Sequence, residues 1–135
     1  SKQYEGNPEI KSKIRAQQRM AARRRMLAAV PDATVVVTNP THLAVALQYD
    51  MNEAQSAPVV VAKGKRKIAE RIKAVAREHG VPVVENKPLA RALYAVTEVG
   101  MEIPAEFYQV VAELLVQIYR EQQGGTGMRK FAHAV

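Results

Sequence analysis

The sequence predicts an α/β fold in which a small mixed four-stranded sheet is flanked by helices and preceded by a long basic N-terminal helix. Short β-branched runs of strand length alternate with longer segments whose apolar residues recur at helical spacing. Proline and glycine stand at the junctions between them. The chain has 135 residues, 47% of them hydrophobic, which is enough for one core. We expect a linker helix over 1–30, one globular domain over 31–123 and a flexible tail over 124–135.

The first half of the chain predicts one helix and three strands. Residues 8–27 are rich in helix-forming Ala, Arg, Lys, Gln and Met. Apolar positions are sparse there, so we expect a mostly free-standing helix that packs only near its end, through Met20, Met26, Leu27 and Val30. Pro31 and Asp32 end this helix. Apolar or β-branched runs then predict strands over 34–38, 43–48 and 59–62, with a polar loop over 50–57.

The second half predicts a strand and three helices. Residues 65–79 form a helix that stops at Gly80 and whose inward positions are Ile68, Ile72, Val75 and Ala76. A strand over 81–84 follows, so we expect a right-handed parallel crossover from the third strand to the fourth. Pro88 begins a helix that runs to about residue 99, ends at Gly100 and buries Leu89, Leu93 and Val96. After Pro104, the last helix carries an apolar stripe of Phe107, Val110, Val111, Leu114, Leu115 and Ile118.

Positive charge is concentrated in two clusters of a chain whose formal net charge is +7. The first comprises Lys11, Lys13, Arg15, Arg19, Arg23, Arg24 and Arg25. The second comprises Lys63, Lys65, Arg66, Lys67, Arg71, Lys73 and Arg77. Such clusters suit the phosphates of nucleic acid or of an anionic membrane, or they are simply solvated helix faces. Glu70 and Glu78 interrupt the second cluster and favour a solvated face there, whereas no acid interrupts the first.

The sequence offers few residues for enzymatic chemistry. It contains no Cys, which excludes disulfides, thiolate metal sites and a Cys nucleophile. The histidines His42, His79 and His133 lack metal-binding spacing, and His79 before Gly80 suits a helix C-terminus. Neither a dinucleotide fingerprint nor a phosphate loop is present. We therefore predict no cofactor and no metal, and we find no apolar stretch of the roughly 18 residues that span a bilayer.

The most informative residues are Asn39, Pro40, Thr41 and His42, between the first two predicted strands. An Asn normally cyclises when the N–H of the next residue attacks its side chain, but proline has no N–H. The reverse attack remains open: the Asn39 amide nitrogen closes on its own carbonyl and expels Pro40. A tight turn can pre-position these groups, and His42 can move protons while Thr41 orients the turn. The alternative is a simple turn without chemistry, because Asn-Pro commonly initiates turns.

Further short motifs extend on both sides of this tetrapeptide. In chain order they are Glu5-Gly6-Asn7-Pro8-Glu9-Ile10-Lys11, the run from Val35 to Leu47, Ser56-Ala57-Pro58, Val61-Ala62-Lys63-Gly64, Val81-Pro82, Pro88-Leu89-Ala90-Arg91-Ala92-Leu93-Tyr94 and Ile103-Pro104. Over nearly all of residues 5–120 the chain resembles the type III export-apparatus switch proteins, the family of flagellar FlhB and injectisome YscU. The run from Ala46 to Asp50 and the Ser56-Ala57-Pro58 string resemble the flagellar branch.

The resemblance implies the cytoplasmic domain of an integral protein of the bacterial inner membrane, at whose cytoplasmic face it would lie. It implies cleavage of the chain's own Asn39-Pro40 bond, supported by Thr41 and His42, once per molecule and therefore not as a multiple-turnover enzyme. In the family this cleavage switches export from rod and hook subunits to filament subunits. The implied partners are those exported subunits, the export gate and other export-apparatus proteins, and a hook-length ruler protein. The helix from Lys11 to Arg25 would meet anionic lipid.

Two other classes of function stay open at this stage. A basic nucleic-acid-binding module would bind in a strongly salt-dependent way and would not need Asn39. We expect no nucleic acid, since the aromatic residues do not interleave with the basic clusters. A multiple-turnover enzyme would need a deep polar pocket. If cleavage occurs, residues 1–39 and 40–135 should remain one domain, because the first strand stays paired in the sheet.

Overall fold

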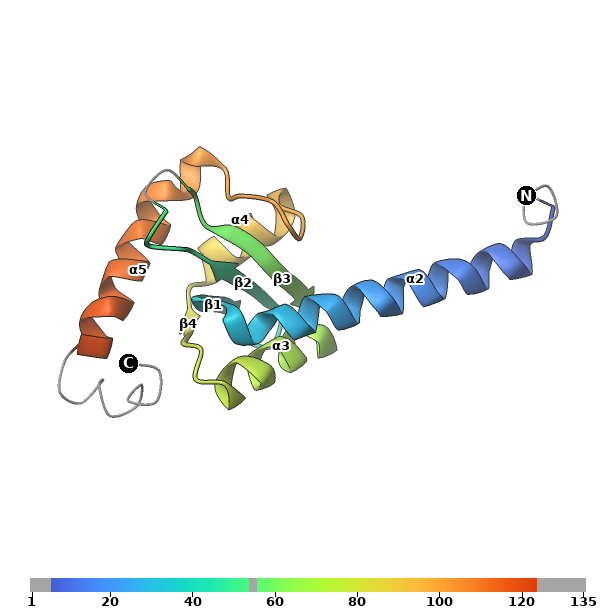
Figure 1. Cartoon of the computed structure of the whole chain (residues 1–135), viewed down its shortest axis with the longest axis horizontal. Helices are drawn as coiled ribbons and strands as arrows, with labels where there is room; N and C mark the ends of the chain where they lie inside the picture. Colours follow the sequence, from blue (N-terminus) through green and yellow to red (C-terminus); the bar gives the residue numbers. More distant parts are fainter. Residues whose placement is uncertain (1–5, 54–55, 124–135) are drawn as a thin grey trace.

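The computed structural model, which describes residues 6–53 and 56–123, is a four-stranded sheet with helices on both faces and one helix that projects away (Figure 1). Its elements are α2 (Pro8–Ala29), the short 3-10 helix η1 (Val30–Asp32), β1 (Val35–Asn39), β2 (Leu43–Gln48), β3 (Val59–Lys65), α3 (Lys67–Glu78), β4 (Val83–Glu85), α4 (Lys87–Val96), the 3-10 helix η2 (Ala105–Phe107) and α5 (Tyr108–Gln123). The predicted fold class is confirmed. The predicted tail over 124–135 lies outside the described residues.

The sheet has the strand order β3-β2-β1-β4, so β1 is a central strand. β1 pairs antiparallel with β2 and parallel with β4, with Val36 opposite Ala46 on one side and opposite Val83 on the other. β2 and β3 are also antiparallel. β3 and β4 therefore run in the same direction, as the predicted crossover requires, but they occupy opposite edges of the sheet. Since β1 is hydrogen-bonded to β2 on one side and to β4 on the other, it joins β4 to the rest of the sheet.

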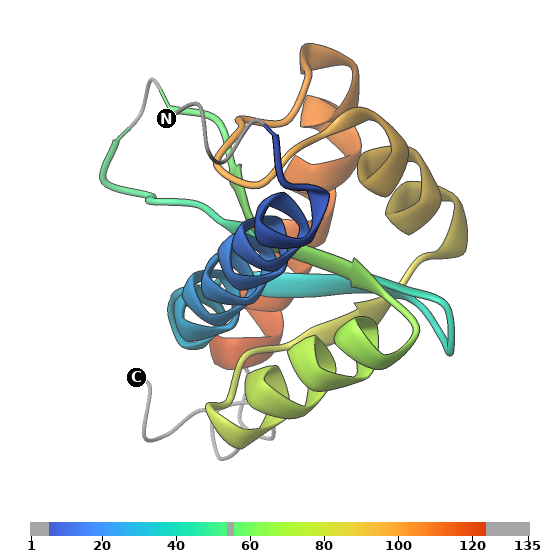
Figure 2. The ribbon, with the colours of Figure 1, turned by 90° about the vertical axis from the view of Figure 1, so that its right-hand side faces the viewer.

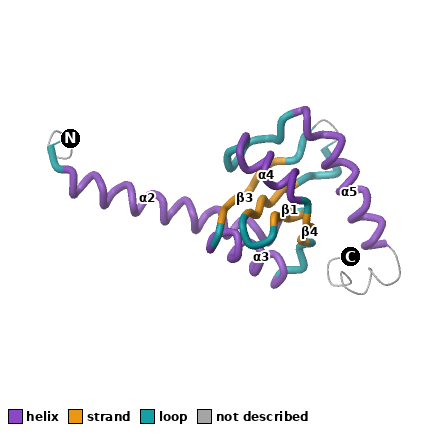
Figure 3. Tube along the Cα trace, turned by 180° about the vertical axis from the view of Figure 1, so that it is seen from behind, coloured by secondary structure: helices purple, strands orange, loops and turns teal. Residues whose placement is uncertain are grey.

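The core lies in two layers, one on each face of the sheet. Val35 and Val37 face α4 and α5, whereas Val36 faces α3. All three valines are completely buried. Figures 2 and 3 show this arrangement, with α3 on one side of the strands and α4 and α5 on the other. Burial on both faces explains why β1 is a continuous apolar run rather than an alternating one.

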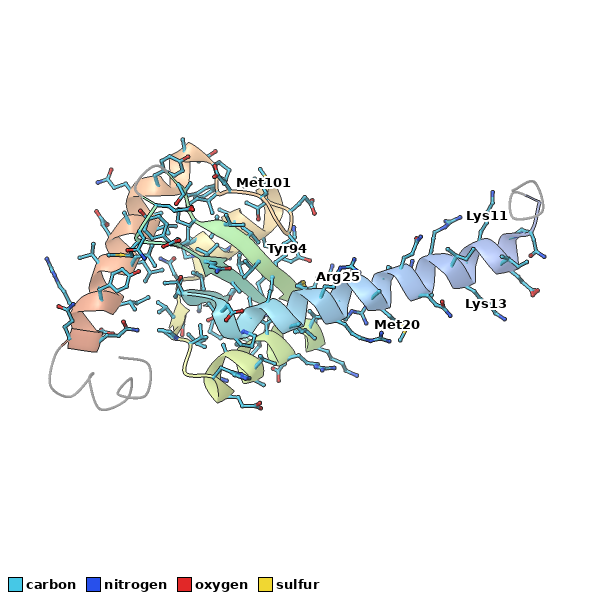
Figure 4. All side chains as sticks on the ribbon, in the orientation of Figure 1. Lys11, Lys13, Met20, Arg25, Tyr94 and Met101 are labelled. Carbon is cyan, nitrogen blue, oxygen red and sulfur yellow. The ribbon has the colours of Figure 1, made fainter. Side chains whose placement is uncertain are left out.

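Helix α2 leaves the domain and buries none of its residues (Figure 1). Asn7 caps its N-terminus, since the Oδ1 atom accepts hydrogen bonds from the N–H groups of Glu9 and Ile10. Met26 and Leu27 pack against the α3 side of the core, as predicted. The prediction for Met20 is wrong: its side chain is 48% exposed and points into solvent on the projecting part of the helix (Figure 4). No helix among residues 6–53 and 56–123 is long and apolar enough to cross a bilayer.

Several predicted boundaries shift by a few residues. β3 runs on to Lys65 because its last residues pair with the start of β2. α4 ends at Val96, so that Val96 is half exposed and its predicted inward position is wrong. Gly100, with a φ of 94°, lies in the turn beyond the helix rather than at its end. In α5 the buried stripe is Val111, Leu115 and Ile118, whereas Val110, which we expected to face inward, is exposed.

Lys63 binds backbone carbonyls at the C-terminal end of α4. Its ammonium donates hydrogen bonds to the backbone carbonyls of Tyr94, at 2.9 Å, and Thr97, and lies 4.6 Å from the centre of the Tyr94 ring. Only its contact with Glu98, at 4.0 Å, is an ion pair. The ammonium therefore satisfies carbonyls that the helix leaves open at its C-terminus. Lys63 belongs to the framework of the domain, and not to a solvated basic cluster as the sequence suggested.

We expect Lys63→Met to destabilise the domain by about 2 kcal/mol, because charge-assisted hydrogen bonds are lost and carbonyls lose their donor. Urea unfolding at constant m value would measure this change. Lys65→Met is the matched control, since Lys65 is exposed in the same strand and should change stability by less than about 0.5 kcal/mol. Equal effects of the two substitutions would contradict this role of Lys63.

Candidate functional site

Asn39, Pro40, Thr41 and His42 form a tight turn at one end of the sheet. Asn39 is the last residue of β1 and pairs with Leu43, the first residue of β2. The N–H of His42 donates to the carbonyl of Asn39 at 3.0 Å, which closes the turn. Pro40 occupies the second position and Thr41, with a φ of 69°, the third. This combination is that of a type II turn, which asks for glycine at the third position.

Thr41 is therefore strained. A β-branched residue with positive φ is an outlier, and a backbone held in such a region costs about 1–3 kcal/mol. The Thr41 side chain is exposed, so side-chain burial does not compensate for this strain. The strain lies directly beside the Asn39-Pro40 bond and is relieved if the turn opens.

We expect Thr41→Gly to stabilise the uncut domain by about 1 kcal/mol, because glycine adopts the required φ without strain. The comparison is best made in an Asn39→Ala background, where no cleavage can interfere, by urea unfolding. Thr41→Ala is the control, since it removes the hydroxyl and the branch but keeps the unfavourable φ. If Thr41→Gly gave no gain over Thr41→Ala, the turn would not be strained at this residue.

The side chain of Asn39 is nearly buried, yet no hydrogen bond within the described residues holds it. Asn39 is 8% exposed, and its amide makes no hydrogen bond to another residue of the described chain. No buried side-chain nitrogen or oxygen among those residues lacks a partner, so the Asn39 amide keeps some contact with solvent. The neighbouring Thr38 hydroxyl, by contrast, reaches the Val84 carbonyl at 3.5 Å. No hydrogen bond within the described residues therefore holds the Asn39 amide away from its own backbone carbonyl.

That carbonyl is polarised by the turn. Its oxygen accepts the His42 N–H, and a donor at this position also stabilises the negative charge that would develop there if a nucleophile attacked the carbonyl carbon. The arrangement can thus support attack by the Asn39 amide nitrogen on its own carbonyl. Sequence reasoning selected His42 for its imidazole and missed its backbone N–H. The signal was present, because Pro40 at the second position of a turn places the N–H of the fourth residue on the carbonyl of the first.

The structure brings Asn39 and Pro40 together with the backbone of His42, but it leaves the side chains of Thr41 and His42 exposed. Two residues that sequence reasoning did not select also reach the turn. Asn86 donates its N–H to the Thr38 carbonyl at 2.9 Å, and Arg66 donates its N–H to the His42 carbonyl at 3.0 Å. Both are main-chain contacts, so no side-chain pattern in the sequence indicates them.

A second surface feature is a groove of about 400 Å³ between the segment after β2 and α5. Its walls include Tyr49, Pro58, Leu115 and Tyr119, and it is mainly apolar. Burial, with the neighbouring Tyr49, raises the pKa of the Tyr119 phenol. The described residues that line this groove include no histidine and therefore provide no nucleophile–base pair of the Ser-His kind.

The remaining candidates are structural. His79 is the C-cap residue of α3, as predicted, with its Nδ1 atom 3.0 Å from the Val75 carbonyl. His133 lies outside the described residues. Within residues 6–53 and 56–123, no three His, Asp or Glu side chains gather in a way that could hold a metal ion. The turn at Asn39 is therefore the candidate site with defined chemistry.

Comparisons with known proteins point to one family. The model of the FlhB HrpN YscU SpaS Family matches residues 1–118. The flagellar biosynthetic protein FlhB of Salmonella typhimurium is 55% identical over 119 residues, covering 88% of this chain and 31% of that protein. FlhB of Bacillus subtilis is 51% identical over 122 residues, covering 90% of this chain and 34% of that protein. The chain thus spans about a third of the length of these relatives.

Solved structures share the fold. The cytoplasmic domain of FlhB from Shewanella putrefaciens superposes with a TM-score of 0.70 at 40% identity, covering 78% of this chain and 84% of that one. A mutated EscU C-terminal domain superposes with a TM-score of 0.64 at 35% identity, covering 67% of this chain and 90% of that one. The fold is thus of the class found in these cytoplasmic and C-terminal domains. The chain belongs to the FlhB HrpN YscU SpaS Family, and the names of its relatives support the flagellar branch.

Proposed function

We propose that this chain is the self-cleaving cytoplasmic domain of a flagellar type III export component, and that it cuts its own Asn39-Pro40 bond by asparagine cyclisation. The observation that carries the proposal is the geometry of the turn. A strained type II turn presents the Asn39 carbonyl to a backbone donor. The amide of Asn39 itself, the nucleophile, has no competing hydrogen bond within the described residues.

The reaction forms one bond and breaks one. The Asn39 Nδ2 atom attacks the Asn39 carbonyl carbon, and the His42 N–H stabilises the oxyanion. The bond from that carbon to the Pro40 nitrogen then breaks, and a proton passes from the Asn39 amide to the Pro40 amine. Residues 1–39 end in a cyclic imide, which one water molecule opens. Holding nucleophile and carbonyl in one tight turn can supply up to about 7–11 kcal/mol of the barrier.

The cleavage consumes its own bond, so each molecule reacts once and the domain is not a multiple-turnover enzyme. Its effect is local. A new amine at Pro40 and a new end at Asn39 replace the turn, the strain at Thr41 is released, and a different surface is presented. That change switches export from rod and hook subunits to filament subunits, in concert with the export gate, other export-apparatus proteins and a hook-length ruler protein.

The same proposal places the domain at the cytoplasmic face of the bacterial inner membrane. α2 supports this position, because it projects from the domain with basic side chains on more than one side, such as Lys11 and Lys13 (Figure 4). Positive charge beside a membrane favours anionic lipid headgroups by about 1 kcal/mol per Lys or Arg. The helix would then act as the basic connection between membrane and domain.

Mass spectrometry of the purified chain under denaturing conditions tests the function. We expect two fragments, residues 1–39 and 40–135, in place of one chain. An intact chain after prolonged incubation would overturn the proposal. A parallel titration with duplex DNA at two salt concentrations tests the rival class: tight, steeply salt-dependent binding that is unaffected by Asn39→Ala would favour a nucleic-acid-binding module.

The role of the His42 side chain can be separated from that of its backbone. His42→Ala keeps the N–H on the Asn39 carbonyl but removes the imidazole, and we expect cleavage to slow by about 10²-fold, the lower end of general acid–base effects. His42→Gln is the control, because glutamine keeps a polar side chain but lacks a basic group. It should cleave as slowly as His42→Ala. Cleavage time courses by mass spectrometry would measure both. A wild-type rate in His42→Ala would show that the imidazole takes no part.

A further inference from the structure

The turn that contains the Asn39-Pro40 bond is held from both sides by the first residues of two helices. Upstream, the Asn86 N–H donates to the Thr38 carbonyl at 2.9 Å, and Asn86 is the N-cap residue of α4. Downstream, the Arg66 N–H donates to the His42 carbonyl at 3.0 Å, and Arg66 is the N-cap residue of α3. α3 and α4 lie on opposite faces of the sheet, and both begin at the end of the sheet where β1 turns into β2 (Figure 2).

His42 links the downstream contact to the reacting group. Its carbonyl accepts the Arg66 N–H, while its own N–H donates to the Asn39 carbonyl at 3.0 Å. Two successive backbone hydrogen bonds therefore connect the start of α3 to the carbonyl that cyclisation attacks. If His42 moved, the donor on the Asn39 carbonyl would move with it.

Arg66 adopts a conformation that arginine avoids. Its φ of 55° and ψ of −120° match the first central position of a type II′ turn, which favours glycine. Its side chain makes no capping hydrogen bond. What holds it is the backbone: the Arg66 carbonyl accepts the Glu70 N–H at 3.0 Å while its N–H holds His42. Thr41 and Arg66 are the non-glycine residues of the described chain with positive φ. Both adjoin His42, Thr41 as the preceding residue and Arg66 through its hydrogen bond to the His42 carbonyl.

We propose that Arg66 is a positioning residue for self-cleavage. Its backbone N–H fixes the His42 peptide, so that the His42 N–H stays on the Asn39 carbonyl during the attack. Asn86 fixes the Thr38 peptide on the other side. The guanidinium of Arg66 is exposed and takes no part, so the residue acts through its backbone conformation and not through its charge. This inference rests on the proposed function.

Substitutions that change backbone preference separately from charge test the proposal. Arg66→Gln removes the charge and should leave the cleavage rate unchanged. Arg66→Val makes the observed φ harder to adopt and should slow cleavage by about tenfold. Arg66→Gly adopts it freely and should cleave at least as fast as wild type. Rates are taken from time courses after a pulse of cell-free synthesis, at a temperature where circular dichroism shows every variant folded.

Hydrogen exchange gives a second readout that does not need cleavage. In an uncut Asn39→Ala background, Arg66→Val should reduce the protection of the residue 66 and His42 amides, whereas Arg66→Gln should not. If the wild-type chain cleaves and all residue 66 variants cleave at the same rate, the positioning role alone would be overturned. A wild type that never cleaves would overturn the proposed function, and unchanged amide protection in Arg66→Val would overturn the backbone contact itself.

Discussion

Asn39→Ala is expected to abolish cleavage, giving a single intact chain under conditions where the wild type is fully cut. The substitution removes the nitrogen that attacks, and attack by bulk water lacks the advantage of an intramolecular nucleophile, which amounts to a factor of about 10⁵ or more. Since the Asn39 amide makes no hydrogen bond within the described residues, alanine leaves no partner unsatisfied. We therefore expect a change in stability of less than about 1 kcal/mol.

Asn39→Asp is the matched control for shape. It is nearly isosteric with the wild type but replaces the amide nitrogen with a carboxylate oxygen, so the chain should also stay intact at neutral pH. Denaturing mass spectrometry over a time course reads both variants. Cleavage of Asn39→Ala at the wild-type rate would show that the bond is cut by another agent, such as a contaminating protease.

The second large effect concerns the two products. We expect cut domain to migrate as one species in native size-exclusion chromatography and to separate in denaturant. Val35, Val36 and Val37 are fully buried in the central strand, and burying each is worth about 1.5–3 kcal/mol. That sum approaches the whole stability of an ordinary domain, about 5–15 kcal/mol. Residues 40–135 produced without β1 should therefore be unfolded.

A matched truncation sharpens this expectation. Residues 30–135 lack α2, which buries none of its residues, but they keep β1. This shorter chain should fold, with amide protection in the sheet close to that of the full chain and a far-UV circular dichroism spectrum that lacks only the helical signal of α2, whereas residues 40–135 should show neither folded signal. If residues 40–135 folded alone, the product chains would have no need to stay together, and cleavage would release a fragment instead of reshaping a surface.

Local sequence patterns predicted most of this fold, because the residues within each helix or strand already favour that structure. β-branched runs predicted β1 and β2 within a residue, and Pro8 and the helix-forming composition predicted α2. The end of α4 could not be predicted in this way. Lys63 reaches from β3 to the carbonyls of Tyr94 and Thr97 there, and such contacts between distant segments leave no periodic pattern.

The same division applies to the candidate site. The chemistry of Asn39 and Pro40 and the turn itself can be deduced from the residues, because proline fixes the turn position and removes a competing N–H. The strained φ of Arg66 and its contact with His42 cannot. They arise where the start of α3 meets the β1–β2 turn, and they use only main-chain atoms, which are the same in every sequence.

The chemical identity of the new C-terminus at Asn39 tests cyclisation most directly. Tandem mass spectrometry of the fragment of residues 1–39 would detect it soon after cleavage. We expect a cyclic imide that later opens to a mixture of asparagine and isoasparagine, since water can attack either carbonyl of the ring. A fragment that ends only in ordinary asparagine from the earliest time point would show direct hydrolysis and contradict attack by the Asn39 amide.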